Sequence, residues 1–158
     1  MPKVDENFEH EFEVSAQPEE VWAFLWDIEA MANCIPGCEE VSTLEEKKLY
    51  KVQMRRKVGP FLVRMEVDLV VVESEYGRRI IVESTGRDKK LRSELSQRVR
   101  ISLSPKDGSG SHVGIQTRFQ LSGVLATLGW TLLSGHIYSE LNQFVEVVKN
   151  KIEERQTQ

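Results

Sequence analysis

A few polar side chains fall at positions where the surrounding pattern predicts an apolar face. His10 and Arg56 each lie on the apolar side of an alternating stretch, where an unpaired polar group would be costly to bury. Such a group either lies at a strand end, near water or a carboxylate such as Glu73, or orients a ligand in a cavity. Together with Tyr50, the His10 and Arg56 side chains could also orient a substrate and transfer protons. His136 is expected to be solvated or packed against a sheet edge.

The sequence contains no motif typical of nucleophilic, phosphate or metal chemistry. It has no G-x-S-x-G, P-loop or H-E-x-x-H pattern. Gly108, Gly110 and Gly114 lack the spacing of a dinucleotide-binding loop and fall between two predicted strands, so we expect a hairpin turn there. The three histidines are far apart in the sequence, whereas a zinc site needs about four ligands. We therefore predict no catalytic residue, metal or cofactor, and we favour a binding protein over an enzyme.

Two cysteines, Cys34 and Cys38, flank the turn Ile35-Pro36-Gly37. The N-terminus has no apolar segment of the secretory type, so we expect a cytoplasmic protein with free thiols. The net charge of −4 argues against a general nucleic-acid-binding surface. The basic run Arg55-Arg56-Lys57 is the local exception to this charge balance.

Most of the chain alternates between apolar and polar residues, which predicts strands with one wet face. The first strand contains Phe8 and Phe12 between glutamates, and Pro18 then begins two short helices. From Glu39 to Leu121 the pattern predicts a meander of antiparallel strands. We expect one domain over residues 7–155, with loose termini at 1–6 and 156–158.

The last element is predicted to be one long helix from Ser122 to Arg155. Its apolar residues recur every three or four positions, which gives it one buried face. Between Val124 and Leu133 further leucines add a second apolar face, so this half is either buried all round or faces an unfilled space. Spanning a bilayer would take about 20 apolar residues, so we predict no transmembrane segment.

A sheet of six to seven strands with one polar face needs an apolar cover, and only this helix is long enough to supply it. The predicted fold is therefore α+β, with a curved antiparallel sheet wrapped around the C-terminal helix. The excess apolar surface at the start of that helix predicts a ligand cavity. The candidate ligand-binding residues are Phe24, Met31, Ile35, Tyr50, Met54, Arg56, Met65, Phe119, Leu125, Leu128 and Trp130.

Several short motifs resemble those of the carbon monoxide dehydrogenase G-subunit family, within the START-like superfamily of lipid-transfer domains and polyketide cyclases. They are Pro18, Val21-Trp22, Phe24-Leu25, Asp27, Met31, Cys34-Ile35-Pro36-Gly37, Val58-Gly59-Pro60, Gly123, Leu125, Gly129, Leu141 and Phe144. The resemblance covers nearly the whole predicted domain. It implies the helix-grip fold and an apolar cavity between sheet and helix.

The resemblance also implies a function without implying catalysis. Our leading hypothesis is a carrier or binding protein for a hydrophobic small molecule, lipid-like or quinone-like. The resemblance also implies an accessory role to a molybdenum hydroxylase of the carbon monoxide dehydrogenase type. The alternatives are an enzyme of the polyketide cyclase or hydratase kind, and an assembly factor whose apolar helix half docks on a larger enzyme or on a second copy of the chain. Some family members carry a long extension associated with membrane attachment, so peripheral membrane contact stays open.

Overall fold

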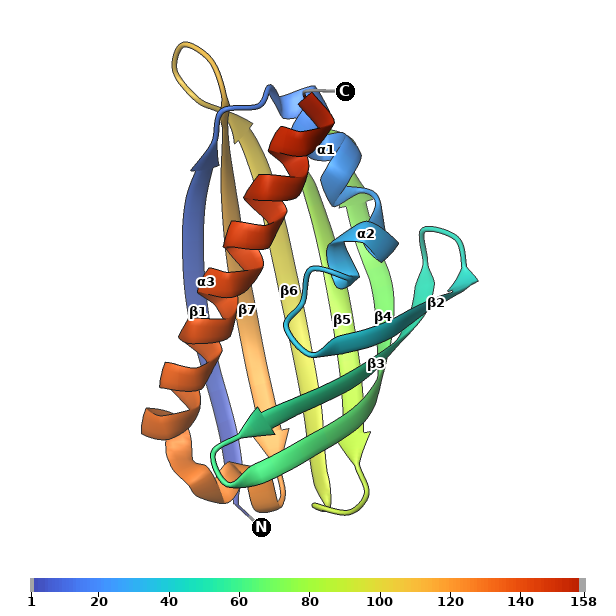
Figure 1. Ribbon diagram of the computed structural model, residues 1–158, viewed down its shortest axis with the longest axis vertical. Helices are drawn as coiled ribbons and strands as arrows, with labels where there is room; N and C mark the ends of the chain where they lie inside the picture. Colours follow the sequence, from blue (N-terminus) through green and yellow to red (C-terminus); the bar gives the residue numbers. More distant parts are fainter. Residues whose placement is uncertain (1, 157–158) are drawn as a thin grey trace.

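A curved antiparallel sheet wraps around one long helix in the computed structural model of the protein, which describes residues 2–156 (Figure 1). The elements follow in the order β1 (Lys3–Val14), α1 (Pro18–Leu25), α2 (Ile28–Ala32), β2 (Cys38–Glu45), β3 (Leu49–Val58), β4 (Phe61–Glu75), β5 (Arg79–Asp88), β6 (Ser93–Pro105), β7 (Ser111–Ser122), the 3-10 helix η1 (Val124–Leu128) and α3 (Gly129–Gln156). The seven strands lie in the order β1-β7-β6-β5-β4-β3-β2. The predicted helix-grip architecture is confirmed.

The alternating sequence pattern produces the two faces of the sheet. On β1, Phe8 and Phe12 are buried whereas Glu9 and Glu11 are exposed. The same alternation runs along β7, where every second residue from Ser111 to Leu121 is buried. Because successive side chains of a strand point to opposite faces, the concave face is apolar and the convex face is polar. The apolar face is covered by α3, α1 and α2 (Figure 1).

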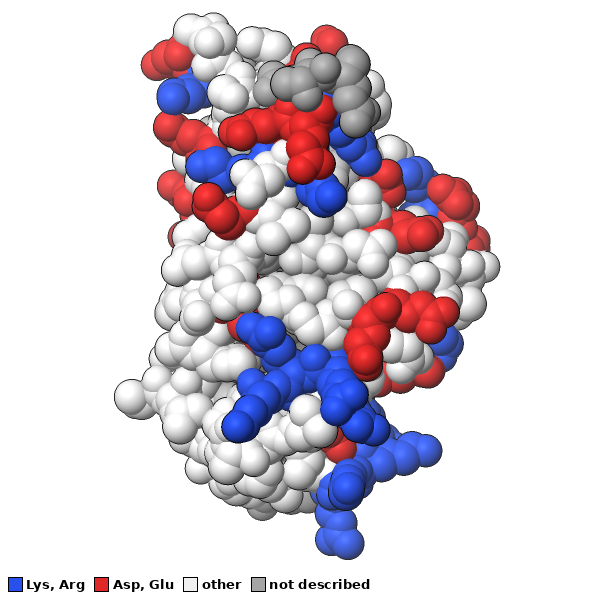
Figure 2. Space-filling view, viewed as in Figure 1, with Lys and Arg blue, Asp and Glu red and all other residues white. Residues whose placement is uncertain are grey.

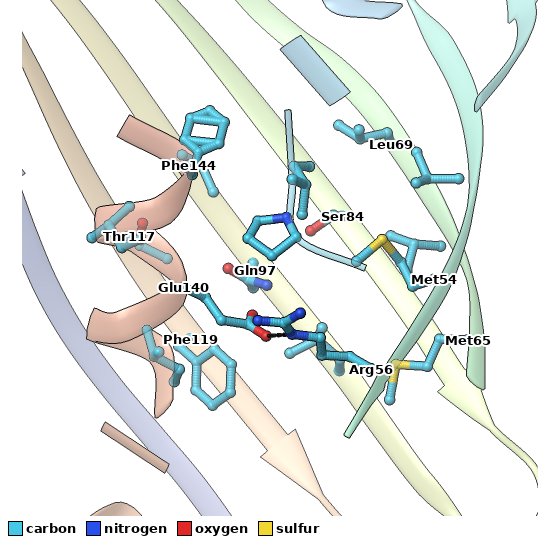
Figure 3. Close-up of a pocket in the computed structure, with 18 of the residues that line it drawn as sticks. Met54, Arg56, Met65, Leu69, Ser84, Gln97, Thr117, Phe119, Glu140 and Phe144 are labelled. Carbon is cyan, nitrogen blue, oxygen red and sulfur yellow. Dashed lines mark hydrogen bonds and ion pairs between the residues drawn. The ribbon is translucent and has the colours of Figure 1, made fainter. Parts of the chain in front are cut away.

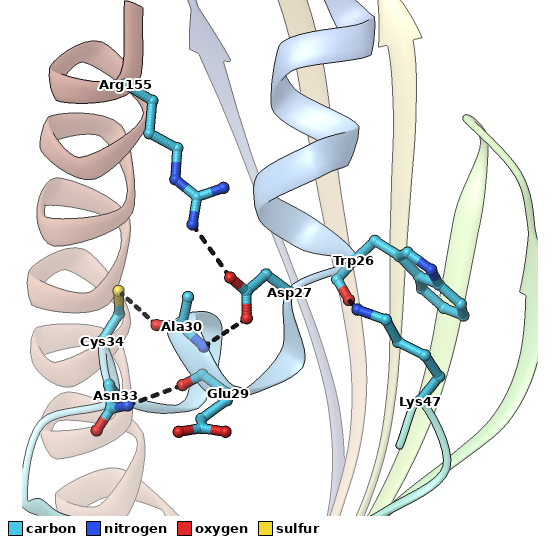
Figure 4. A network of polar contacts seen from close by, with 8 residues as sticks. All are labelled: Trp26, Asp27, Glu29, Ala30, Asn33, Cys34, Lys47 and Arg155. Carbon is cyan, nitrogen blue, oxygen red and sulfur yellow. Dashed lines mark hydrogen bonds and ion pairs between the residues drawn. The ribbon is translucent and has the colours of Figure 1, made fainter. Parts of the chain in front are cut away.

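A polar network holds the two short helices against the end of α3 (Figure 4). The Asp27 carboxylate accepts a hydrogen bond from the backbone N–H of Ala30 at 3.1 Å and so caps α2. The other carboxylate oxygen accepts a hydrogen bond from Arg155 of α3, also at 3.1 Å. Nζ of Lys47 donates to the backbone oxygen of Trp26 at 2.7 Å. These contacts attach the helices both to α3 and to the β2–β3 turn.

The prediction of one long helix that begins at Ser122 is wrong about where the helix starts. Strand β7 continues through Ser122, η1 follows, and α3 begins only at Gly129. Gly123 and Gly129 adopt φ values of 94° and 79°, which interrupt a right-handed helix. A Cβ on Gly123 would lie 1.9 Å from the backbone oxygen of Arg92, so this residue must be glycine for the chain to turn here.

The N-terminal boundary was also predicted incorrectly. Residues 3–6 were expected to be loose, but β1 begins at Lys3, which pairs with Ser122 of β7. Because Lys3, Asp5 and Glu6 are charged, this segment lacks the alternation of apolar and polar residues that predicts a strand. Val4 on its inner face is nevertheless buried. At the other end, α3 extends to Gln156, and residues 157–158 lie outside the described part of the chain. Within residues 2–156, no helix combines the length and apolar character needed to cross a membrane.

Candidate functional site

A cavity of about 360 Å³ lies between the concave face of the sheet and α3 (Figure 3). Strands β3 to β7 form its floor and one wall, α3 forms the opposite wall, and α2 with the turn that follows it closes one side. This volume lies near the lower end of the range of about 300–1,000 Å³ that is typical of small-molecule pockets.

The walls of the cavity are almost entirely apolar. The inward-facing positions of the strands supply branched aliphatic side chains, and two flexible methionines, Met54 and Met65, lie on β3 and β4 (Figure 3). Methionine adapts its shape easily, so this wall can fit ligands of different outline. The apolar lining comprises Phe8, Ile28, Met31, Ala32, Ile35, Pro36, Val52, Met54, Val58, Val63, Met65, Val67, Leu69, Val82, Leu95, Val99, Ile101, Ile115, Phe119, Leu121, Leu125, Leu133, Ile137, Leu141 and Phe144.

Two uncharged polar side chains face the cavity from its floor. Ser84 of β5 and Gln97 of β6 are direct partners in the sheet register, and both line the cavity. Within residues 2–156, neither side chain has a hydrogen-bond partner. Both residues are partly buried, so the hydroxyl and the carboxamide are available to a polar atom of a bound molecule.

Charged side chains meet where β3 and α3 approach each other (Figure 3). Nε of Arg56 donates to Oε1 of Glu140 at 2.5 Å, and Nη2 of Arg56 lies 3.4 Å from Oε1 of Gln143. Nε2 of His136 lies 2.8 Å from the same Glu140 oxygen, but among the described residues this buried nitrogen has no contact with hydrogen-bond geometry. On the outer surface, other Lys and Arg side chains gather near the end of β3 (Figure 2).

The turn at Gly37 places Arg56 at the edge of the cavity. Gly37 has a φ of 87°, and its backbone oxygen accepts a hydrogen bond from the N–H of Arg55 at 2.9 Å. A Cβ on Gly37 would lie 2.7 Å from the Arg55 oxygen and 3.2 Å from the Arg56 side chain. Glycine therefore lets the turn lie directly on β3, beside Arg56. Ile35 and Pro36 of the same turn line the cavity.

Comparison with known proteins decides the family. Residues 11–153 match the CoxG family, which is described as the G subunit of carbon monoxide dehydrogenase. The chain belongs to the CoxG family. The match contains both the Cys34-to-Gly37 turn and the whole lining of the cavity apart from Phe8. No curated protein matches the sequence.

Solved structures share the fold of this CoxG family member at low identity. A conserved protein from Geobacillus kaustophilus has 18% identity and a TM-score of 0.86, with 94% of this chain and 96% of that chain covered. The Zhui aromatase/cyclase from Streptomyces sp. R1128 has 16% identity, 96% coverage of both chains and a TM-score of 0.71. A START superfamily protein from Mycobacterium smegmatis has 12% identity, coverage of 98% and 99%, and a TM-score of 0.69. These similarities establish a START-like fold.

Seven of the eleven predicted ligand-binding residues line the cavity of this CoxG family member, and four do not. Those that line it are Met31, Ile35, Met54, Arg56, Met65, Phe119 and Leu125. Phe24 is buried beneath Arg155 instead, and the buried Tyr50 hydroxyl accepts a hydrogen bond from the backbone N–H of Lys47. Leu128 packs near Gly59, and Trp130 contacts Phe8 and Phe119 from outside the cavity.

The polar residues of the cavity were the least predictable. His136 was expected to be solvated or packed at the sheet edge, but it lines the cavity. The carboxylate near Arg56 is Glu140, whereas Glu73 contacts Arg79. Glu140, Ser84 and Gln97 were not predicted as site residues. The alternation on β5 and β6 places Ser84 and Gln97 in line with inner positions such as Val82 and Val99, and this phase was the signal that could have identified them.

The cysteine thiols are free, and burial raises the pKa of both. Sγ of Cys34 donates to the backbone oxygen of Ala30 at 3.3 Å. A raised pKa favours the protonated thiol at neutral pH, and the Cys34 contact links the start of the turn to α2. Among residues 2–156, no group of three or more His, Cys, Asp or Glu side chains is arranged to hold a metal ion.

Proposed function

We propose that the protein binds and carries a hydrophobic small molecule, lipid-like or quinone-like, in the cavity between the sheet and α3. The observation that carries this proposal is an apolar cavity of about 360 Å³ whose floor presents the unpaired side chains of Ser84 and Gln97. An apolar body would be buried against the aliphatic walls. A single polar group of the ligand would pair with the serine and the glutamine.

The expected affinity comes mainly from burial. Removing apolar surface from water contributes about 25 cal/mol per Å², and association costs at least about 4 kcal/mol in lost translational and rotational freedom. A ligand that buries about 300 Å² of apolar surface would therefore gain about 7.5 kcal/mol before these costs. One or two hydrogen bonds at the floor would then select among ligands of similar size.

Native mass spectrometry of the freshly purified protein, followed by solvent extraction, tests the proposal. We expect a co-purifying hydrophobic molecule, or stoichiometric uptake of an apolar fluorescent dye. Val99→Trp would fill the cavity from β6 and abolish dye uptake, whereas Val72→Trp, at a position that is 42% exposed outside the cavity, would not. An empty protein that no hydrophobic probe enters would refute the proposal.

The enzyme hypothesis has less support from the positions of its proposed groups. Of His10, Tyr50 and Arg56, only Arg56 lines the cavity. His10 lies on β1 and the buried Tyr50 lies on β3, both outside the lining. A proton-transfer mechanism needs its groups within hydrogen-bond reach of one substrate, so these three residues do not form one site.

Service to a molybdenum hydroxylase of the carbon monoxide dehydrogenase type is our proposal for the cellular role, and the family match supports it. We propose that such a partner contacts the end of the molecule where Leu128 and Leu132 lie near Gly59 of the β3–β4 turn. Leu132 of α3 is 45% exposed there. Co-purification of the hydroxylase with wild-type protein, and its loss in Leu132→Glu, would support the role. Co-purification that is unaffected by Leu132→Glu would exclude this surface.

A further inference from the structure

The charged groups of the cavity neutralise each other. Arg56, Glu140 and His136 are the titratable side chains among its described lining residues. Arg56 and Glu140 form an ion pair at 2.5 Å, with their side chains 35% and 24% exposed. The partly buried pair therefore presents almost no net charge to a ligand.

Glu140 occupies the position that a ligand carboxylate would need. A free arginine binds carboxylates and phosphates strongly through its planar array of donors. Here Nε already donates to Glu140, and Nη2 is directed toward Gln143. An anionic head group would have to displace Glu140 or lie beside it, and two like charges at close range repel each other more strongly at a partly buried site than in bulk water.

The floor of the cavity also favours an uncharged ligand over an anionic one. Ser84 and Gln97 offer a hydroxyl and a carboxamide, both uncharged, with no partner among the described residues. These groups can pair with a carbonyl or hydroxyl group. They do not offset the cost of moving a full negative charge out of water.

We infer that Glu140 is a specificity-determining residue: by neutralising Arg56, it makes the cavity select uncharged ligands over anionic amphiphiles of the same chain length. This inference rests on the proposed function, because it concerns the ligand of the same cavity. Removal of the carboxylate would leave Arg56, whose side chain is 35% exposed, without its anionic partner at the edge of an apolar space, where the anionic head group of a ligand can take the place of Glu140. The selectivity would then shift toward anions.

Dodecanol and dodecanoate are suitable probes because they share a chain and differ in head-group charge. Their dissociation constants would be measured by calorimetry below the micellar concentration of dodecanoate and the solubility limit of dodecanol, at about pH 8, where a carboxylic acid is ionised. We expect wild-type protein to bind dodecanol at least about tenfold more tightly than dodecanoate. Glu140→Gln should strengthen dodecanoate binding about tenfold and change dodecanol binding by less than about threefold.

Two further variants show whether the shift arises from Arg56. Glu146→Gln removes an exposed carboxylate from the same helix and should leave both dissociation constants unchanged. The double variant Arg56→Gln, Glu140→Gln removes both members of the pair and should lose the gain for dodecanoate that Glu140→Gln shows. Circular dichroism and the thermal midpoint establish whether each variant is folded.

The outcomes separate this inference from the proposed function. If wild-type protein binds neither probe, the carrier proposal fails. If dodecanol binds but wild-type protein takes up dodecanoate equally well, the inference fails and the carrier proposal stands. This comparison needs no variant, so it is decisive even if Glu140→Gln does not fold. If Glu140→Gln folds and keeps the wild-type preference, Glu140 does not determine specificity.

Discussion

Gln97 occupies an inner position of β6 where an aliphatic residue would pack equally well. Its carboxamide has no partner within residues 2–156 and faces Ser84 across the strand pair. An unpaired polar group on an apolar face costs stability, so we attribute its presence to ligand binding. The same reasoning explains why sequence analysis alone did not identify it: a glutamine in an alternating strand is normally a surface residue.

The first prediction concerns Gln97→Leu. Loss of the carboxamide should weaken dodecanol binding by about two- to tenfold, because one hydrogen bond contributes about 0.5–1.5 kcal/mol. The urea midpoint should stay the same or rise, since the unpaired amide is removed from an apolar surface. Gln116→Leu, on the outer face of β7, is the matched control and should not change binding. Unchanged dodecanol affinity in Gln97→Leu would mean that the ligand does not contact this residue.

The second prediction concerns Tyr50, which is 2% exposed and whose hydroxyl accepts a hydrogen bond from Lys47 N–H at 2.9 Å. Burial raises the pKa of Tyr50 above its usual value of 10.0. The unfolded chain therefore loses this proton at lower pH than the folded protein does. The stability that Tyr50 contributes is complete below about pH 10 and is lost as the pH rises further.

Tyr50→Phe should accordingly be less stable by about 1 kcal/mol at neutral pH, because the Lys47 N–H loses its acceptor. Between about pH 9 and about pH 11, its stability should fall less steeply than that of the wild type. Urea unfolding at both pH values measures the two effects. Tyr76→Phe is the control, since the Tyr76 side chain is 85% exposed. Parallel pH profiles for the wild type and Tyr50→Phe would contradict this account.

At the scale of elements, periodicity predicted the strands and helices well, but it failed at their boundaries. The apolar spacing of α3 continues into η1, and the pattern therefore predicted one helix from Ser122. The break at Gly123 depends on a close approach to Arg92 of the β5–β6 turn, a contact that no local pattern contains. Lys3 to Glu6 join β1 for a similar reason, because pairing with β7 compensates for their charged character.

The third prediction tests the turn that places Arg56. Gly37 and Gly77 both adopt positive φ, at 87° and 73°, but a Cβ on Gly77 meets nothing within 4 Å, whereas one on Gly37 would lie 2.7 Å from the Arg55 oxygen. Gly77→Ala should cost about 1 kcal/mol from backbone strain alone. Gly37→Ala should cost about 3 kcal/mol, since the turn must also move away from β3.

Urea unfolding gives both free energies of unfolding, and ligand binding distinguishes their consequences. Only Gly37→Ala should weaken dodecanol binding, because Ile35 and Pro36 of its turn line the cavity. Equal destabilisation of the two variants would show that the close approach at Gly37 relaxes without cost. In that case, the turn would not be what fixes Arg56.

At the scale of the whole molecule, the sequence was sufficient to predict a sheet wrapped around a helix with a cavity between them. The pairing of the charged residues at the edge of that cavity was not predictable. Arg56 and Glu140 are 84 positions apart in the chain, and their contact depends on how α3 rotates about its axis over the curved sheet. The apolar stripe predicts which face of a helix is buried, but it does not predict the partner of a polar residue at the edge of that face.

The last prediction is that a ligand bound in the cavity stabilises the folded protein against thermal unfolding. A ligand that binds only the folded state stabilises it by about 2.7 kcal/mol at a free concentration of about 100 times the dissociation constant. For a chain of this size, that corresponds to a rise in thermal midpoint of about 5–10 °C. Differential scanning fluorimetry with increasing dodecanol measures the shift in the wild type and in Val99→Trp. The filled variant should fold without any ligand-dependent shift, and an equal shift in both proteins would place the binding site outside the cavity.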